Sequence, residues 1–143
     1  MAAEYSYVPV QTVAIGDSVA FLNFERACKK GYISHRSGSG LFKLKGIKGC
    51  CNTTYKVSFN GNIAVPTDGT PGDISLAITE DGEALGNATA TFTVPLVERI
   101  SNVSMSTFVT VPCNCCVSVT VRNVSAATAL DVSNANIIFE PVS

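Results

Sequence analysis

The sequence predicts an all-β protein, an antiparallel β-sandwich of the jelly-roll type, and three observations predict it. Apolar and polar residues alternate with a period of two along most of the 143 residues, which is typical of half-buried strands. Pro, Gly and Asn residues interrupt this alternation at short intervals. Apolar residues recur at helical spacing over three turns nowhere in the chain. Eight or more short strands in a chain of this length favour a sandwich.

The N-terminal part predicts an arm followed by the first strands. Residues 1–12 are expected to form an arm, because Tyr5, Tyr7 and Pro9 stand there without a clear core pattern. A single domain is expected from 13 to 143, with strands over 13–21 and 40–47. The stretch 23–30, NFERACKK, is the only one that suggests a short helical turn.

The middle of the chain gives the clearest strands. Residues 55–65 alternate and stop at Pro66, residues 74–78 alternate next, and residues 88–94 stop before Pro95. The pair Asp81-Gly82 lies between the second and third of these strands, and Asp-Gly is a strong signal for a hairpin turn.

The last third repeats the pattern. Val103, Met105, Thr107, Val109 and Val111 share one face of a strand that Pro112 ends. Further strands are expected over 117–121 and 135–139.

Composition limits the function classes. Apolar residues make up 46% and charged residues 15% of the chain, and the net charge is −1. A surface poor in charge suits a protein that buries part of its outside in an assembly. A net charge near zero does not favour a nucleic-acid binder, although the basic residues of the first third, with Tyr32 and Phe42, leave that as a minor hypothesis. The first residues show no basic n-region or apolar h-region, so we expect no secretory signal, and no membrane span is expected.

No catalytic constellation is found. The only histidine, His35, lies in a polar, Gly-rich stretch, where an ordinary surface residue is expected. Nucleophile-elbow, phosphate-loop and zinc-protease motifs are absent from the sequence. We therefore expect a protein that is not an enzyme and that uses no cofactor.

The strand sequence resembles the trimeric jelly rolls of the complement/tumour-necrosis-factor-like superfamily, as found in Firmicutes and their phages. The resemblance rests on YKVSFNGNIAVP, ISLAITEDGEALG, ATATFTVP, SMSTFVTVP, VSVTVRNVS and SNANIIFEPV. It covers Gly40 to Val142, and its most specific piece is Asn134-Ala135-Asn136 followed by Ile137, Ile138, Phe139 and Glu140.

The resemblance implies a homotrimeric virion protein. We expect a capsid decoration or head-fibre protein of a bacteriophage or prophage, assembled in the host bacterial cytoplasm and located on the capsid surface. Its partners would be itself and the major capsid protein, which the arm residues Tyr5, Tyr7 and Pro9 would contact. The alternative is a receptor-binding or adhesive module of a phage fibre or of a bacterial or spore surface, with its ligand at loops 67–73, 80–87 and 123–130. The residues expected to pack the core or the trimer are aromatic: Tyr55, Phe59, Phe92, Phe108 and Phe139.

Five of the six cysteines lie in two groups, one just before residue 55 and one just before residue 117. Adjacent strand residues point to opposite faces, and the spacing is poor for structural zinc, which prefers Cys-x2–4-Cys. In the implied fold a disulfide is possible between the two groups, free thiols are the equal alternative, and a metal comes third. The residues concerned are Cys50, Cys51, Cys113, Cys115 and Cys116.

Overall fold

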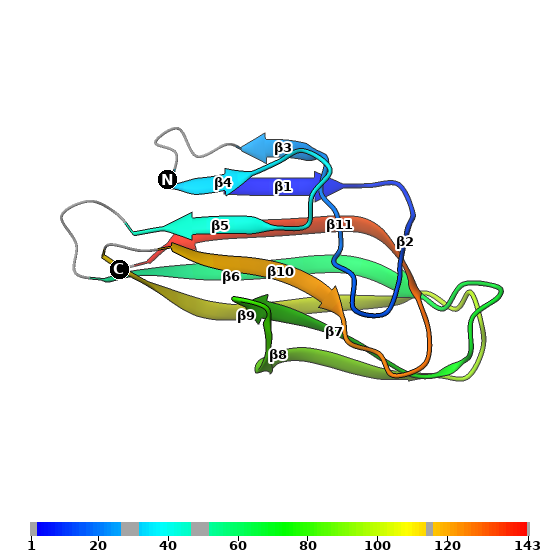
Figure 1. The fold of residues 1–143 in the computed structure, drawn as a ribbon. Coiled ribbons are helices and arrows are strands. Elements are labelled where there is room, and N and C mark those ends of the chain that lie inside the picture. Colours follow the sequence, from blue (N-terminus) through cyan, green and yellow to red (C-terminus); the bar gives the residue numbers. More distant parts are fainter. Residues whose placement is uncertain (1–2, 27–31, 47–51, 114–115, 143) are drawn as a thin grey trace.

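A computed structural model describes residues 3–26, 32–46, 52–113 and 116–142. The described residues form two antiparallel sheets that pack face to face, and Figure 1 shows the two layers one in front of the other. Among these residues there is no helix, and so none that is long and apolar enough to cross a membrane.

The first sheet has the order β3-β1-β11-β6-β9, and β2 also pairs with β11. Its strands are β1 (Ala3–Tyr7), β2 (Gln11–Val13), β3 (Asn23–Arg26), β6 (Asn52–Ala64), β9 (Ser101–Pro112) and β11 (Leu130–Pro141). The first and last strands are neighbours, since Tyr5 pairs with Ile137.

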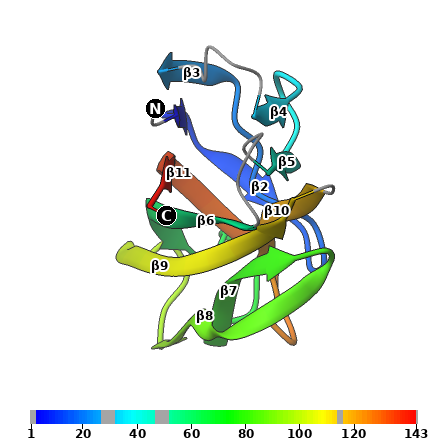
Figure 2. The ribbon, with the colours of Figure 1, turned by 90° about the vertical axis from the view of Figure 1, so that its left-hand side faces the viewer.

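The second sheet has the order β4-β5-β10-β7-β8. Its strands are β4 (Ile33–His35), β5 (Phe42–Lys45), β7 (Gly72–Glu80), β8 (Glu83–Val94) and β10 (Cys116–Asn123). Neighbouring strands that are far apart in the sequence, such as β5 and β10, give the crossed connections of a jelly roll. Figure 2 shows the layers turned by 90°.

The core lies between the sheets, and the period-two alternation of the sequence explains which residues form it. Along β9 each second residue, from Val103 to Val111, is buried, and its neighbours are exposed. The predicted hairpin is present between β7 and β8, where Glu80 pairs with Glu83. Asp81 and Gly82 both have positive φ, 51° and 85°, as a two-residue type I′ turn requires.

Three expectations for the first third of the chain are wrong. Residues 3–7 are not an arm but strand β1, which lies between β3 and β11. Of the range 23–30, residues 23–26 form strand β3 instead of a helical turn, and 27–30 lie outside the described residues. Of the strand expected over 13–21, only Val13 lies in a strand, as the last residue of β2, and Ser18 forms an isolated bridge with Arg122.

Candidate functional site

The outer face of the first sheet is poor in charge. The outward positions of β6, β9 and β11 carry mainly Ser, Thr and Asn, with charges at Lys56, Asp131 and Glu140. A strand face without a charge pattern is easily covered by another protein surface, because few ions have to be desolvated.

Asparagine side chains form a hydrogen-bonded row across this face. Asn102 Nδ2 donates to the Oδ1 atoms of Asn60, at 3.2 Å, and Asn62, at 3.1 Å, and Asn62 Nδ2 donates to Asn134 Oδ1 at 3.2 Å. Asn134 occupies the left-handed region with φ 53°, which Asn tolerates better than most residues, and the β6–β11 register shifts at this point. The row gives a neutral patch in which each asparagine side chain has at least one hydrogen-bond partner.

Phe108 interrupts the polar face. Its side chain is 64% exposed on β9, directly opposite Lys56 on β6. A hollow of about 220 Å³ lies beside the ring and is lined by Lys56, Asn87, Ser106, Thr107 and Phe108. Asn87 Nδ2 donates to Thr107 Oγ1 at 3.4 Å, so that β8 forms one wall. A large apolar ring beside a hollow is the arrangement of an interface anchor.

The other four aromatic residues that were expected to pack the core or the trimer do not lie on this face. Tyr55, Phe59 and Phe139 are fully buried in the core, and the Tyr55 hydroxyl donates to Lys45 O at 2.7 Å. Phe92 is half-buried on β8. Of the five, Phe108 is the most exposed.

The expected capsid-contact residues are separated by the fold. Tyr5 is 5% exposed, and its ring lies 4.9 Å from that of Phe42 and 6.3 Å from that of Phe139, so it is a core residue and cannot contact a capsid. Tyr7 is half-buried at the end of β1. Pro9 is exposed in the β1–β2 connection.

Apart from Phe108, the most exposed large apolar residues among those described lie in two connections at one end of the sandwich. Val8 and Val10 in the β1–β2 connection, and Leu96 and Ile100 in the β8–β9 connection, are each more than half exposed. Both connections lie at the end on the right of Figure 1. Sequence reasoning missed this surface, because isolated apolar residues in turns give no periodic signal.

The predicted disulfide falls largely outside the described residues. Cys50, Cys51 and Cys115 lie outside them, while Cys113 is exposed and Cys116 begins β10. Asn52 pairs with Pro112, so the described ends of β6 and β9 from which the two cysteine groups continue are neighbours. The cross-link stays a prediction. Within the described ranges no three His, Cys, Asp or Glu side chains gather as metal ligands.

His35 differs from the exposed loop residue that was expected. It belongs to β4, is half-buried and stacks on Phe42 with a centroid distance of 4.3 Å and an interplanar angle of 13°. Its Nε2 atom donates to Ser39 O at 2.8 Å. Three alternating residues, Ile33–His35, are too short a run to predict a strand.

Comparison with known proteins supports the fold. No protein-family model and no curated protein matches the sequence. Among solved structures, the Eiger TNF from S. frugiperda aligns with a TM-score of 0.67 at 9% identity, over 100% of this chain and 92% of that one.

Two vertebrate ligands align as well. Rabbit GITRL gives a TM-score of 0.53 at 14% identity, over 99% of this chain and 93% of that one. Pika GITRL gives 0.51 at 13% identity, over 97% and 92%. These matches, together with the two antiparallel sheets, show that the chain has the TNF-like jelly-roll fold that its sequence predicts.

Proposed function

We propose that the chain is a non-enzymatic virion structural protein: a homotrimer that decorates the capsid of a bacteriophage or prophage of the Firmicutes. The single observation that carries the assembly is the exposed ring of Phe108 on a neutral sheet face. The virion role rests on the resemblance of the strand sequences, and the TNF-like fold is compatible with it.

Phe108 and its hollow suggest how copies meet. The ring and the 220 Å³ hollow lie side by side on one edge of the molecule, so the ring of one copy would enter the hollow of the next. Because ring and hollow adjoin, such a contact can pair two copies reciprocally, or it can close into a ring when the rotation between copies allows it. A threefold rotation gives the proposed trimer.

The capsid contact is placed at the apolar end of the sandwich. Val8, Val10, Leu96 and Ile100 offer exposed apolar side chains there, and Pro9 lies among them in the sequence. The Glu98 amide donates to Val65 O at 2.7 Å, and Thr67 Oγ1 donates to Glu98 Oε1 at 2.5 Å. These bonds hold the β8–β9 connection against the β6–β7 connection, and a preformed surface loses less entropy on binding.

The trimer is tested by multi-angle light scattering at micromolar concentration. We expect a mass of about 45 kDa for the wild type, three times the 15.0 kDa chain, and about 15 kDa for Phe108→Ser, because a central aromatic anchor carries ≥ ~2 kcal/mol of binding energy. Leu96→Ser, which removes an exposed apolar side chain away from this face, keeps the trimer mass. A monomeric wild type would contradict self-association, and a trimeric Phe108→Ser would contradict the placement of the interface.

The virion role is tested on particles induced from the bacterium that carries the gene. Immunogold labelling against the chain should mark the particle heads, and the double variant Val10→Asp with Leu96→Asp should keep its trimer mass but fail to label them. Labelling of tail tips, fibres or the cell surface would favour the receptor-binding module and overturn the decoration proposal.

A further inference from the structure

The β4–β5 connection, residues 36–41, is held in one conformation by hydrogen bonds to Phe21 and Leu22. The Gly38 amide donates to Phe21 O at 3.0 Å, the Phe21 amide donates to Ser39 O at 3.2 Å, and Ser37 Oγ donates to Leu22 O at 3.1 Å. Gly38 has φ +86°, and a Cβ at Gly40 would lie 2.5 Å from Val19 O. The connection needs Gly38 for its positive φ and Gly40 for its close approach to Val19.

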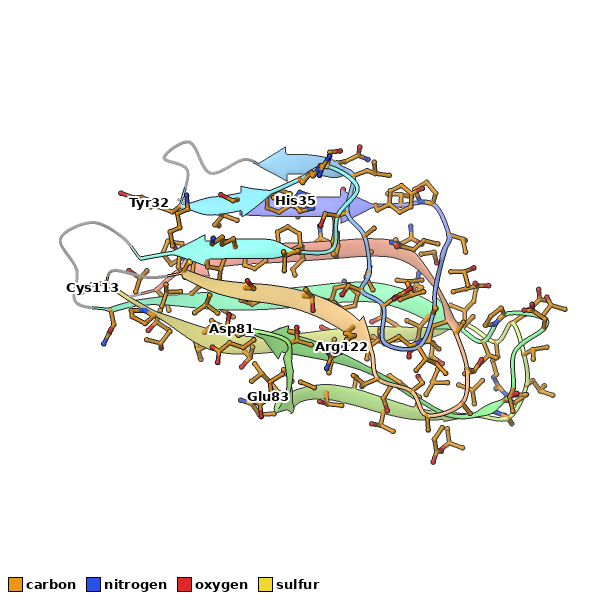
Figure 3. The ribbon with its side chains drawn as sticks, in the orientation of Figure 1. Tyr32, His35, Asp81, Glu83, Cys113 and Arg122 are labelled. Atoms are coloured by element: carbon orange, nitrogen blue, oxygen red, sulfur yellow. The ribbon has the colours of Figure 1, made fainter. Side chains whose placement is uncertain are left out.

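The contacts of His35 fix the position at which the connection starts. Its ring contacts the rings of Phe42, at 4.3 Å, and Tyr5, at 4.9 Å, and its Nε2 atom donates to Ser39 O. Figure 3 labels His35 where β4 passes beside β1. The backbone of the next residue, Arg36, therefore starts from a rigid base, and the Arg36 carbonyl accepts a bond from the Ser39 amide at 2.9 Å.

A shallow cavity of about 520 Å³ opens above this connection. Its lining consists of Ser34, His35, Arg36, Ser39, Leu41 and Lys43. Ser34 and Lys43 face each other as a cross-strand pair, and Arg36 and Lys43 are both exposed. Among the described residues no carboxylate lines the cavity, so its two cationic residues have no neutralising partner in the wall.

The chemistry of the lining selects a class of ligand. The guanidinium of Arg36 presents a planar fork that fits a carboxylate or a phosphate, and Lys43 adds a second positive charge. Ser34 contributes a hydroxyl, and the Ser39 hydroxyl, which accepts the Leu41 amide at 3.0 Å, keeps its own hydrogen for donation. Leu41 is 50% exposed and supplies an apolar patch for C–H groups.

We propose that this cavity binds an acidic sugar unit, that is, a hydroxyl-rich ring that carries one carboxylate or phosphate. The oxyanion would lie between Arg36 and Lys43, and the ring would lie over Leu41 with its hydroxyls toward the two serines. The volume is within the range of small-molecule sites, roughly 300–1,000 Å³, and is far larger than a bare anion needs. The site lies on the second sheet, apart from Phe108, and needs neither the trimer nor the capsid.

The test is an NMR titration of the full chain at low salt with four probes: glucuronate, glucose 6-phosphate, glucose and inorganic phosphate. We expect saturable shifts of amide signals in 34–43 with one or both acidic sugars, and much weaker binding of glucose and of inorganic phosphate. Arg36→Ala and Lys43→Ala should each weaken the binding about tenfold or more, since each removes a charge-assisted hydrogen bond to the oxyanion.

Matched controls separate the site from general surface charge. Lys45→Ala, two residues along the same strand, and Arg99→Ala, in the β8–β9 connection, should bind like the wild type. The thermal midpoint of each variant is measured to show that it is folded. Equal binding of glucose, equal binding of inorganic phosphate, no saturable binding of either acidic sugar, or unchanged binding by Arg36→Ala and Lys43→Ala would each overturn the proposal. None of these results bears on the mass of the trimer.

Discussion

Aromatic residues from both sheets meet at Tyr5. Its ring contacts His35 and Phe42 of the second sheet and Phe139 of its own sheet, and Phe42 in turn lies 5.4 Å from Phe21. Tilted and edge-on pairs at such distances add to the energy of area burial. The N-terminal strand is therefore part of what holds the two layers together.

Tyr5→Ala should destabilise the protein by about 3–5 kcal/mol, as expected when a large aromatic side chain is removed from a core. Urea unfolding followed by circular dichroism measures the free energy of unfolding. Pro9→Ala, an exposed position four residues further on, should change it by less than about 0.5 kcal/mol. A Tyr5→Ala protein as stable as the wild type would restore the interpretation of this segment as an arm.

At the scale of elements, long alternating strands could be predicted, and of the short ones β5 was predicted, within the range 40–47. The predicted ranges 55–65, 74–78, 88–94, 103–111, 117–121 and 135–139 all fall on strands, β6 to β11. Their signal is local, because each has a full row of apolar residues on one face. β1, β3 and β4 are five residues or fewer, and β1 finds β11 only across the whole length of the chain.

Part of the candidate site could be predicted from the same alternating pattern. Val103, Met105, Thr107, Val109 and Val111 occupy the inner face of β9, so the period of two already places Phe108 on the outer face. The hollow beside it depends on Asn87 of β8, which no local pattern connects with β9. The His35 cavity depends on the contact between the β4–β5 connection and Phe21, and that contact is equally nonlocal.

At the scale of the whole molecule, the low net charge and the low charge of the Phe108 face both favour self-association. A net charge of −1 gives little electrostatic repulsion between copies. Lys56 lies beside Phe108, but Lys43 and Arg36 lie at the other sheet. Coulomb repulsion therefore opposes self-association only weakly. Because only the folded chain assembles, assembly adds to the stability of the fold.

This linkage predicts a thermal midpoint that depends on protein concentration. If the trimer unfolds to three separate chains, a tenfold dilution removes about 0.9 kcal/mol per chain by mass action, which lowers the midpoint by roughly 2–4 °C for a chain of this size. Scanning calorimetry over a hundredfold concentration range measures the shift. Phe108→Ser should unfold at a midpoint that is independent of concentration, because its chains are already separate. A concentration-independent wild type would contradict coupled assembly, and a Phe108→Ser variant that keeps the dependence would place the interface on another face of the sandwich.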